Sequence, residues 1–496
     1  MKQDIPYALD LLKRINGITI NEAPIYSFFS KYYNGDAHSF WASQMFSLFG
    51  DIKAFSAEKN FEKFLSGEMK NTFLHFLKYT IALCTSFVIS MLFLLKVKMR
   101  GYRVLVYSPD KLKKGTNKDP RLFQIYPVFD EEKISYGEVI HTLLNREFLE
   151  NLFKRKRLVF YLESLSLPFF FLRNRKKEEK YRNELLKASL AHFSKEELPF
   201  VHYILEKYLK RCLLSEFRIA FFSRMLREGG VKELLTIDDA RYANELIVGA
   251  RMSGVKVSMF QHSNFDYFYG LDALPPSLYA FHDTFFMWND YWLARIQELS
   301  PLFSFHKSRL KIGGRMYEYA PKIRGHTPAL KEELTILIPY EVNVDKSEIR
   351  EFLQKVLSCP GTKVLFKVRA DMPLEKQANE YGIDSKGNDR RTQVLTTLSD
   401  EIYASVHLVL GVYSGLLDEM VERGIPVVLL KTSYPLMNDL SAGGMTGSLS
   451  IEENNMCEKL RSVVQVSQTE LLSRRERFMK GTGDARSVVR EILRSL

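Results

Sequence analysis

One histidine stands where a catalytic base is expected. His262 follows an apolar run at 255–260 that reads as a strand, and Asp238 and Asp239 end the strand before it. Ligands bind outside the carboxyl ends of strands in open α/β sheets. An imidazole has an ordinary pKa of about 6.5, so it can take a proton from a hydroxyl near neutral pH. We therefore predict His262 as a general base, with Asp238 and Asp239 orienting it or the acceptor. The alternative is a hydrogen-bonded structural histidine.

The residues around this histidine resemble a known family. Gln261, His262 and Ser263 stand together, and a Trp-Asn-Asp-Tyr-Trp segment follows at 288–292. This combination resembles the cytoplasmic glycosyltransferases of surface-polysaccharide synthesis, two-domain GT-B enzymes related to the CDP-glycerol glycerophosphotransferase group. Many members of that group carry glycine where this chain has Ser263. We assign three polar residues around the histidine to the acceptor side: Arg241, Gln261 and Asn264.

A second constellation follows an apolar run in the last third of the chain. Ser414 and Gly415 stand at the predicted start of a helix, and Glu419 lies about one turn further on. Backbone N–H groups at a helix start can bind an anion, and a serine there can cap the helix. The resemblance implies that the serine region contacts the donor diphosphate and that Glu419 contacts the ribose. A capped helix after a buried strand, which any Rossmann unit contains, is the alternative.

Two further groups of residues are predicted to bind the donor. Gly313, Gly314 and Arg315 resemble the Gly-x-Pro-Arg element of related enzymes, without its proline. Lys367 and Arg369 alternate along a predicted strand and therefore share one face. In the resemblance they stand where Lys-x-His-Pro is usual. Both groups can contact phosphate, whereas the alternatives are an ordinary glycine linker and a solvated strand face.

The composition favours anionic partners and argues against several kinds of site. The chain of 496 residues carries 71 Lys and Arg against 59 Asp and Glu, a net charge of +12. Such a balance suits phosphorylated substrates or anionic lipid, and the basic residues follow no recognisable nucleic-acid-binding pattern. The sequence has no P-loop and no acidic pair in a context typical of a metal site. We therefore expect no cofactor and no metal, with a nucleotide-sugar bound as substrate.

The four cysteines are scattered, at positions 84, 212, 359 and 457. No two of them form a Cys-x-x-Cys pair, so we expect neither a zinc site nor a disulfide framework. This usage fits a reducing compartment. The first residues carry charges without an apolar stretch and do not read as a secretory signal.

Two segments raise the question of a membrane. Residues 79–95 form an uncharged apolar run, which predicts a buried helix, an interfacial helix or a membrane span. Phe169, Phe170 and Phe171 precede a run of basic residues, and together they predict an aromatic, basic surface suited to anionic lipid. The alternative for this second segment is a solvated helix face beside a core strand.

Strands alternate with helices from residue 102 onward, which predicts an α/β fold with parallel sheets. We expect the GT-B plan: two Rossmann-like domains facing a cleft, preceded by a helical extension. Within the first of these domains, 130–148 reads as a turn and a helix. The predicted domains are a helical extension at 1–100 with an apolar helix at 79–95, an acceptor domain at 101–309, a linker at 310–333 and a donor domain at 334–496.

These observations predict a glycosyltransferase that moves a sugar from a nucleotide donor to a lipid-linked or lipopolysaccharide or capsule glycan. Two transferase alternatives stay open: a CDP-glycerol-type polyol-phosphate transferase and a CMP-acid-sugar transferase. A non-enzymatic alternative is an inactive GT-B scaffold that binds glycan or membrane. The expected place is the cytoplasmic face of the cell membrane, with the enzyme peripheral on anionic lipid.

Overall fold

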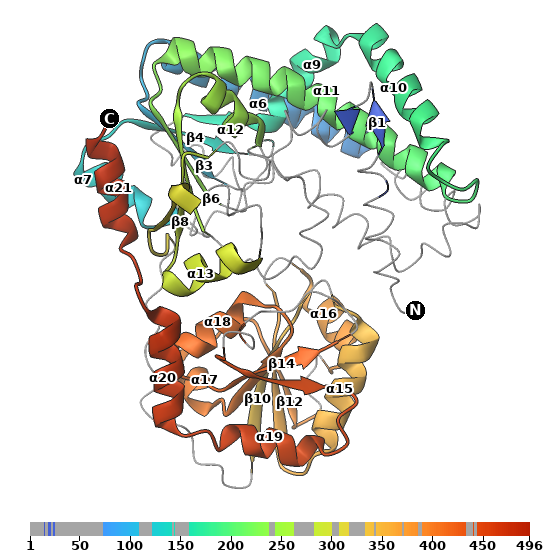
Figure 1. The fold of residues 1–496 in the computed structure, drawn as a ribbon, viewed down its shortest axis with the longest axis vertical. Helices are drawn as coiled ribbons and strands as arrows, with labels where there is room; N and C mark the ends of the chain where they lie inside the picture. Colours follow the sequence, from blue (N-terminus) through green and yellow to red (C-terminus); the bar gives the residue numbers. More distant parts are fainter. Residues whose placement is uncertain are drawn as a thin grey trace.

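The architecture is described from a computed structural model of the chain (Figure 1). It describes residues 14, 18–20, 23–24, 73–108, 122–140, 143, 158–237, 244–261, 282–299, 307–316, 333–341, 344–369, 372–384, 389–432, 440 and 444–496.

The N-terminal domain is built on a seven-stranded parallel sheet. Its strand order is β5-β4-β3-β6-β7-β8-β9, so the order reverses between β3 and β6. The strands are β3 (Val104–Ser108), β4 (Tyr136–Ile140), β5 (Val159–Tyr161), β6 (Glu233–Ile237), β7 (Lys256–Phe260), β8 (Thr284–Met287) and β9 (Leu310–Ile312). Their central strands are almost wholly buried, as expected of a parallel sheet that helices cover on both faces.

Long helices cover this sheet. The longest, α11 (Leu198–Gly229), ends at Gly230, whose φ of 70° is a left-handed conformation that glycine adopts without strain. The other helices of the domain are α6 (Phe73–Lys98), α7 (Ile125–Glu131), α9 (Ser166–Leu172), α10 (Arg175–Ser189), α12 (Asn244–Met252) and α13 (Asp290–Leu299). Two short strands, β1 (Thr19–Ile20) and β2 (Ala23–Pro24), form a small antiparallel pair.

The C-terminal domain repeats the plan with a six-stranded parallel sheet in the order β12-β11-β10-β13-β14-β15. Its strands are β10 (Leu334–Pro339), β11 (Thr362–Lys367), β12 (Thr392–Leu395), β13 (Leu408–Gly411), β14 (Val427–Lys431) and β15 (Gly447–Ser450). Its helices are α15 (Lys346–Ser358), α16 (Leu374–Tyr381), α17 (Asp400–Ser405), α18 (Gly415–Glu422), α19 (Met456–Val464) and α20 (Gln468–Met479). The predicted α/β class with two Rossmann-like domains is confirmed.

The last helix returns to the N-terminal domain. Helix α21 (Ala485–Arg494) buries Ala485, Val489 and Leu493 against the core of the first sheet, beside α7. Figure 1 shows it running up from α20 along one side of the molecule. The chain therefore crosses between the domains twice. The last residues belong to the N-terminal domain, although their position in the sequence placed them in the donor domain.

Several short strands differ from the sequence prediction. The predicted helix at 130–148 contains β4, whose central Glu138 hid the strand pattern; its carboxylate is buried and accepts a hydrogen bond from Tyr126 at 3.0 Å. Strand β9 lies at the start of the predicted linker, and β15 lies in a tail predicted to be helical. Strands of three to five residues carry too little periodicity to be recognised alone.

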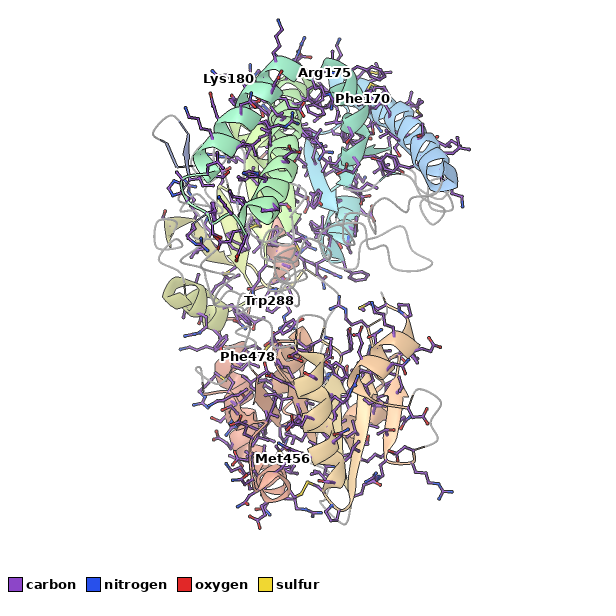
Figure 2. All side chains as sticks on the ribbon, turned by 90° about the vertical axis from the view of Figure 1, so that its right-hand side faces the viewer. Phe170, Arg175, Lys180, Trp288, Met456 and Phe478 are labelled. Atoms are coloured by element: carbon purple, nitrogen blue, oxygen red, sulfur yellow. A yellow bond between two sulfur atoms is a disulfide. The ribbon has the colours of Figure 1, made fainter. Side chains whose placement is uncertain are left out.

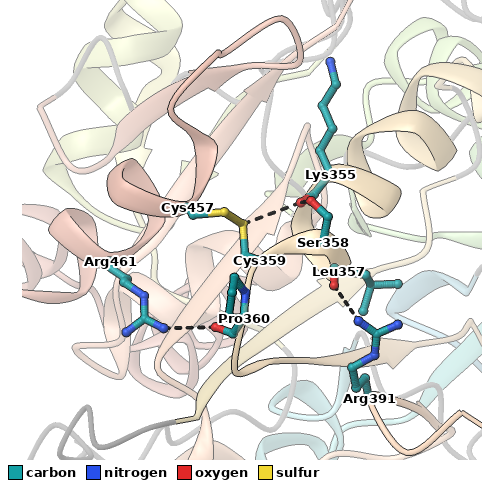
Figure 3. Close-up of a disulfide and its surroundings, with 8 residues drawn as sticks. All are labelled: Lys355, Leu357, Ser358, Cys359, Pro360, Arg391, Cys457 and Arg461. Atoms are coloured by element: carbon teal, nitrogen blue, oxygen red, sulfur yellow. Dashed lines mark hydrogen bonds between the residues drawn. A yellow bond between two sulfur atoms is a disulfide. The ribbon is translucent and has the colours of Figure 1, made fainter.

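The expectation of no disulfide is corrected by the pair Cys359–Cys457. These cysteines are 98 residues apart, and they meet because the end of α15 lies beside the start of α19. In the same turn, the side chain of Arg391 donates to the carbonyl of Leu357 at 2.7 Å, as Figure 3 shows. The cysteine pattern therefore no longer supports a reducing compartment.

Candidate functional site

The carboxyl ends of β10 and β13 meet at the point where the strand order of the C-terminal sheet reverses. Strands β11 and β12 lie on one side of β10, and β13 pairs with β10 on the other side. Ligands of open α/β sheets bind at such switch points. Figure 1 places α16 and α18 on the side of this domain that faces the N-terminal domain. The residues that follow β10, β11 and β13 therefore line the edge where a ligand is expected.

A buried carboxylate occupies the centre of this edge. Glu341 follows β10, and its carboxylate accepts hydrogen bonds from three successive backbone N–H groups after β13. The donors are Val412 at 2.9 Å, Tyr413 at 2.7 Å and Ser414 at 2.6 Å. Burial raises the pKa of the Glu341 carboxyl, and these N–H groups oppose that rise. The backbone cradle expected to hold a donor phosphate thus holds a carboxylate of the protein itself.

A lysine and two tyrosines line the same edge. The ammonium group of Lys346 lies 4.6 Å from the ring centre of Tyr340 and 5.5 Å from that of Tyr381, and it donates to the carbonyl of Glu341. Burial lowers the pKa of Lys346 to about 8, while Glu380 and then Glu341 oppose the shift. A lysine that titrates near neutral pH beside a sheet edge is typical of a functional position.

The predicted donor residues Lys367, Arg369 and Glu419 are brought together here. Burial is the first cause that lowers the pKa of Lys367; Arg369 lowers it further and Glu419 raises it. Glu419 accepts hydrogen bonds from the Tyr403 hydroxyl at 2.8 Å and from Arg423 Nε at 3.0 Å. The three predicted residues therefore share one electrostatic environment at the sheet edge, and Glu419 is held in place by its own partners.

Ser414 caps α18, as the sequence predicts. Its hydroxyl accepts from the N–H of Leu416 at 3.3 Å. Gly415 begins the helix, and a methyl group added there meets no atom of the described residues within 4 Å beyond its own helix and chain neighbours. The helix start thus has open space beside it at Gly415, although Glu341 already occupies the N–H groups before it.

The predicted Gly313-Gly314-Arg315 element lies at the junction of the two domains. The guanidinium of Arg315 forms a two-pronged ion pair with Glu422 at the end of α18, one arm at 2.9 Å, and it stacks 4.2 Å from the Trp288 ring. A Cβ at Gly314, whose φ is 77°, would meet the carbonyl oxygen of Gly483 at 2.1 Å. These residues bind the two domains together, and a donor-binding role for them stays a prediction.

The Trp-Asn-Asp segment serves the same junction. Gln261 accepts from the N–H of Trp288 at 3.0 Å, and Trp288 Nε1 donates to the carbonyl of Gln261 at 2.8 Å. Asn289 donates to the carbonyl of Phe478 at 2.7 Å. Figure 2 shows Trp288 and Phe478 where the two domains meet. Gln261 therefore connects the end of β7 to Arg315 through Trp288. Its role in binding an acceptor stays a prediction.

Five predicted residues lie outside the described part of the chain: Asp238, Asp239, Arg241, His262 and Asn264. Their roles stay predictions. Among the residues that the structure does describe, no three His, Cys, Asp or Glu side chains gather in a way that could hold a metal ion.

Sequence reasoning missed Glu341, Lys346 and the tyrosines around them. One signal was visible: Glu341 directly follows the strand LTILIP, at an edge where ligands bind. Its partners, the N–H groups of residues 412–414, are 71 to 73 positions away. Tyr403 and Arg423 carried no signal, because their relation to Glu419 depends on how α17 and α18 pack.

Neither a protein-family model nor a curated protein matches this sequence. Solved structures with a similar fold include MnaA with UDP from S. aureus, at 10% identity and a TM-score of 0.45, covering 79% of this chain and 94% of that one. MurG from Acinetobacter baumannii is 11% identical with a TM-score of 0.46, covering 80% and 100%. The calicheamicin glycosyltransferase CalG4 is 10% identical with a TM-score of 0.44, covering 79% and 98%. These identities describe a likeness of fold alone.

Proposed function

We propose that this protein is a GT-B glycosyltransferase that transfers a sugar from a nucleotide donor to a glycan of the cell surface, carried on lipid or lipopolysaccharide. The observation that carries the proposal is the cluster at the switch point of the C-terminal sheet. Lys346, Lys367 and Arg369 supply positive charge there, Glu419 is fixed by two hydrogen bonds, and α18 begins beside open space at Gly415. A nucleoside diphosphate offers the negative charge and the ribose hydroxyls that such residues bind.

The donor phosphates have two ways to bind at this edge. They can use Lys346, Lys367 and Arg369 while Glu341 keeps its N–H partners. Alternatively, they displace the Glu341 carboxylate and accept hydrogen bonds from Tyr413 and Ser414 themselves. The Glu341→Gln variant separates the two. It keeps the shape and removes the charge, so it strengthens nucleotide binding in both cases, but much more in the second.

We assign the acceptor and the chemical step to the N-terminal domain. His262 takes the proton of the acceptor hydroxyl while the nucleotide phosphate leaves, with Asp238 or Asp239 orienting it. Under this proposal, His262→Ala lowers kcat by ~10²- to 10⁴-fold with little change in donor affinity. Near-normal turnover of that variant would remove His262 from the mechanism.

One observation favours a second candidate, a scaffold without turnover. The N–H cradle before α18 is filled by Glu341, and Arg315 is engaged by Glu422. In such a scaffold neither group meets a phosphate. The two candidates differ in nucleotide binding, which stabilises a folded protein by mass action.

A thermal-shift screen with UDP, GDP, CDP and CMP tests the proposal. A nucleotide at 100 times its Kd raises the free energy of unfolding by about 2.7 kcal/mol. The transferase proposal expects such a rise with at least one nucleotide, and it expects Lys367→Met/Arg369→Met to abolish the rise. No rise with any of the four, at millimolar concentration, would favour the scaffold.

A further inference from the structure

The helix α6 presents an apolar stripe to the outside of the N-terminal domain. Five of its large apolar side chains are between 44% and 59% exposed: Leu77, Ile81, Val88, Leu92 and Leu95. At ~100° per residue these positions fall within about 60° of the helix circumference. They therefore form one continuous stripe, about 27 Å long at 1.5 Å per residue.

The opposite side of α6 is fixed in the protein core. The hydroxyl of Ser90 accepts hydrogen bonds from the N–H of Tyr161 at 3.0 Å and from the Ser164 hydroxyl at 3.1 Å. Phe93 is fully buried and stacks on Tyr102 with ring centres 5.2 Å apart. The segment 77–98 contains a stretch of 18 residues with a mean hydropathy of 2.1, yet only 28% of that stretch is buried within the fold. A helix that is apolar on all sides needs a second apolar neighbour.

A second exposed apolar group lies beside this stripe. Phe170, Phe171 and Leu172 end α9, which packs against α6, and they are 59% to 75% exposed. The basic residues Arg175 and Lys180 follow on α10, and Figure 2 shows both at the end of the molecule where Phe170 lies. Aromatic rings with basic neighbours are typical of protein surfaces at the headgroup level of a membrane.

The charges along this surface favour one occupant. Helix α6 contains no acidic residue, and Lys78, Lys98 and Arg100 are exposed at its two ends. The neighbouring α10 exposes the acidic side chain of Glu179. It exposes more basic side chains than acidic ones. An apolar stripe bordered by positive charge complements an anionic lipid surface, which offers acyl chains below a layer of negative headgroups.

From these observations we infer that α6 and the end of α9 form a docking surface for an anionic lipid bilayer, with α6 lying in the plane of the membrane. The core contacts of Ser90 and Phe93 rule out a transmembrane position for this helix in the folded protein, because a span requires these contacts to break. The inference goes beyond the proposed transferase function and is tested without any nucleotide.

Vesicle co-sedimentation of the full chain tests the surface. We expect binding to vesicles of phosphatidylglycerol and phosphatidylcholine, weaker binding at high salt, and little binding to phosphatidylcholine alone. Neutralising Arg175, Lys176 and Lys180 with glutamine should weaken binding by about fivefold per residue, since each basic residue contributes about 1 kcal/mol.

The apolar stripe is tested by Ile81→Glu/Val88→Glu/Leu92→Glu, which adds charge at exposed positions and leaves the buried side of α6 unchanged. We expect a loss of vesicle binding of at least about 100-fold, with an unchanged melting temperature. Met252→Glu is the matched control, because Met252 is a 57% exposed apolar residue at the end of α12 and does not belong to the stripe. It should bind vesicles like the wild type.

Three results would overturn the inference. The first is a wild type that ignores anionic vesicles, and the second is an equal loss of binding in Met252→Glu. The third is a lipid-free dimer that the triple glutamate variant converts to monomer, because the occupant of the stripe would then be a second copy of the chain.

Discussion

The junction between the domains and the switch point of the C-terminal sheet both hold buried charge, but they satisfy it differently. At the junction, Arg315 is paired with Glu422, and their side chains are 11% and 0% exposed. At the switch point, Glu341 is held by backbone N–H groups, and Lys346 and Lys367 interact with carboxylates as well as with aromatic rings or a neighbouring arginine. Removing one partner of a buried ion pair leaves an unpaired charge and destabilises the fold, whereas side chains that line the carboxyl edge of a sheet are placed to meet a ligand.

This difference in how charge is satisfied distinguishes Arg315 from Arg369, which the sequence pattern alone does not. Arg315 and Arg369 both follow a strand, and both resemble a phosphate ligand. The structure gives Arg315 a carboxylate partner from the C-terminal domain, Glu422, and a stacking ring from its own domain, that of Trp288. Arg369 lies instead in a loop fixed by Gln377, which accepts from its N–H at 2.7 Å. The backbone of Arg369 is thus fixed within its own domain, whereas the side chain of Arg315 contacts the other domain.

The largest effect is expected at the junction. Arg315→Ala leaves the carboxylate of Glu422 buried without its partner, so the free energy of unfolding should fall by about 3 to 5 kcal/mol. Urea unfolding measures this change. The double variant Arg315→Met/Glu422→Leu should be far more stable than the single variant, because it leaves no unpaired charge. A loss below ~1 kcal/mol in the single variant would show that the pair does not hold the domains together.

At the switch point, the charge of Lys346 should control nucleotide binding. Its pKa of about 8 means that the ammonium form is lost as pH rises through 8. Nucleotide affinity should therefore fall between pH 7 and pH 9, by about 1 to 3 kcal/mol when complete. Lys346→Met should remove this pH dependence.

Lys355→Met is the control for that experiment, because Lys355 also donates to a backbone carbonyl, that of Ile451 at 2.8 Å, away from the switch point. It should keep the wild-type affinity at each pH. A wild-type affinity that stays constant from pH 7 to pH 9 would contradict the role of Lys346.

The start of α18 gives a sharper test of where the ligand lies. Among the described residues, none beyond its own helix and chain neighbours lies within 4 Å of a methyl group at Gly415, so Gly415→Ala should not destabilise the fold. If the nucleotide approaches the backbone there, the methyl group should weaken its binding by roughly 1 kcal/mol or more, the cost of a modest steric misfit. Gly447→Ala is the matched control, since Gly447 is equally open. Equal affinities for both variants would move the ligand away from Gly415.

The smallest expected effect concerns the cap of α18. Ser414→Ala should lower the free energy of unfolding by about 1 kcal/mol, the usual value of a serine cap. Ser467→Ala removes a comparable cap, which accepts from Glu470 at 3.1 Å at the start of α20. Both variants should lose similar stability, and only Ser414→Ala should also weaken nucleotide binding. A binding loss in both would mean that the cap acts through stability alone.

Local patterns were enough to predict most of the fold. The apolar runs at 334–339 and 408–411 are each followed by a segment with helical periodicity. Ser414 follows the second run and caps its helix. The short strand at 136–140 was missed because Glu138 interrupts its apolar pattern. Element type therefore follows from neighbours in the sequence when a segment is long and regular.

The site was only partly predictable for a different reason. Lys367 and Arg369 were predicted from their alternation along a strand and Glu419 from its place in a helix, and the structure brings the three together. Glu341 was not predicted, because the backbone N–H groups that hold its carboxylate lie more than 70 positions away in the sequence. The partner of Arg315 is 107 positions away and that of Cys359 is 98 positions away. Such pairings are set by how the sheets and helices pack, which no local pattern encodes.

Calorimetric titration of nucleotides into the wild type and Glu419→Ala tests the central claim most directly. The claim predicts that the wild type binds UDP, GDP, CDP or CMP and that Glu419→Ala binds it about 1 to 3 kcal/mol more weakly, with its fold intact. Glu470→Ala is the matched control, because Glu470 forms the same kind of pair with Arg474 on α20, at 2.8 Å. It should bind like the wild type. Unchanged affinity in Glu419→Ala, or a wild type that binds none of the nucleotides, would contradict a donor site at the switch point.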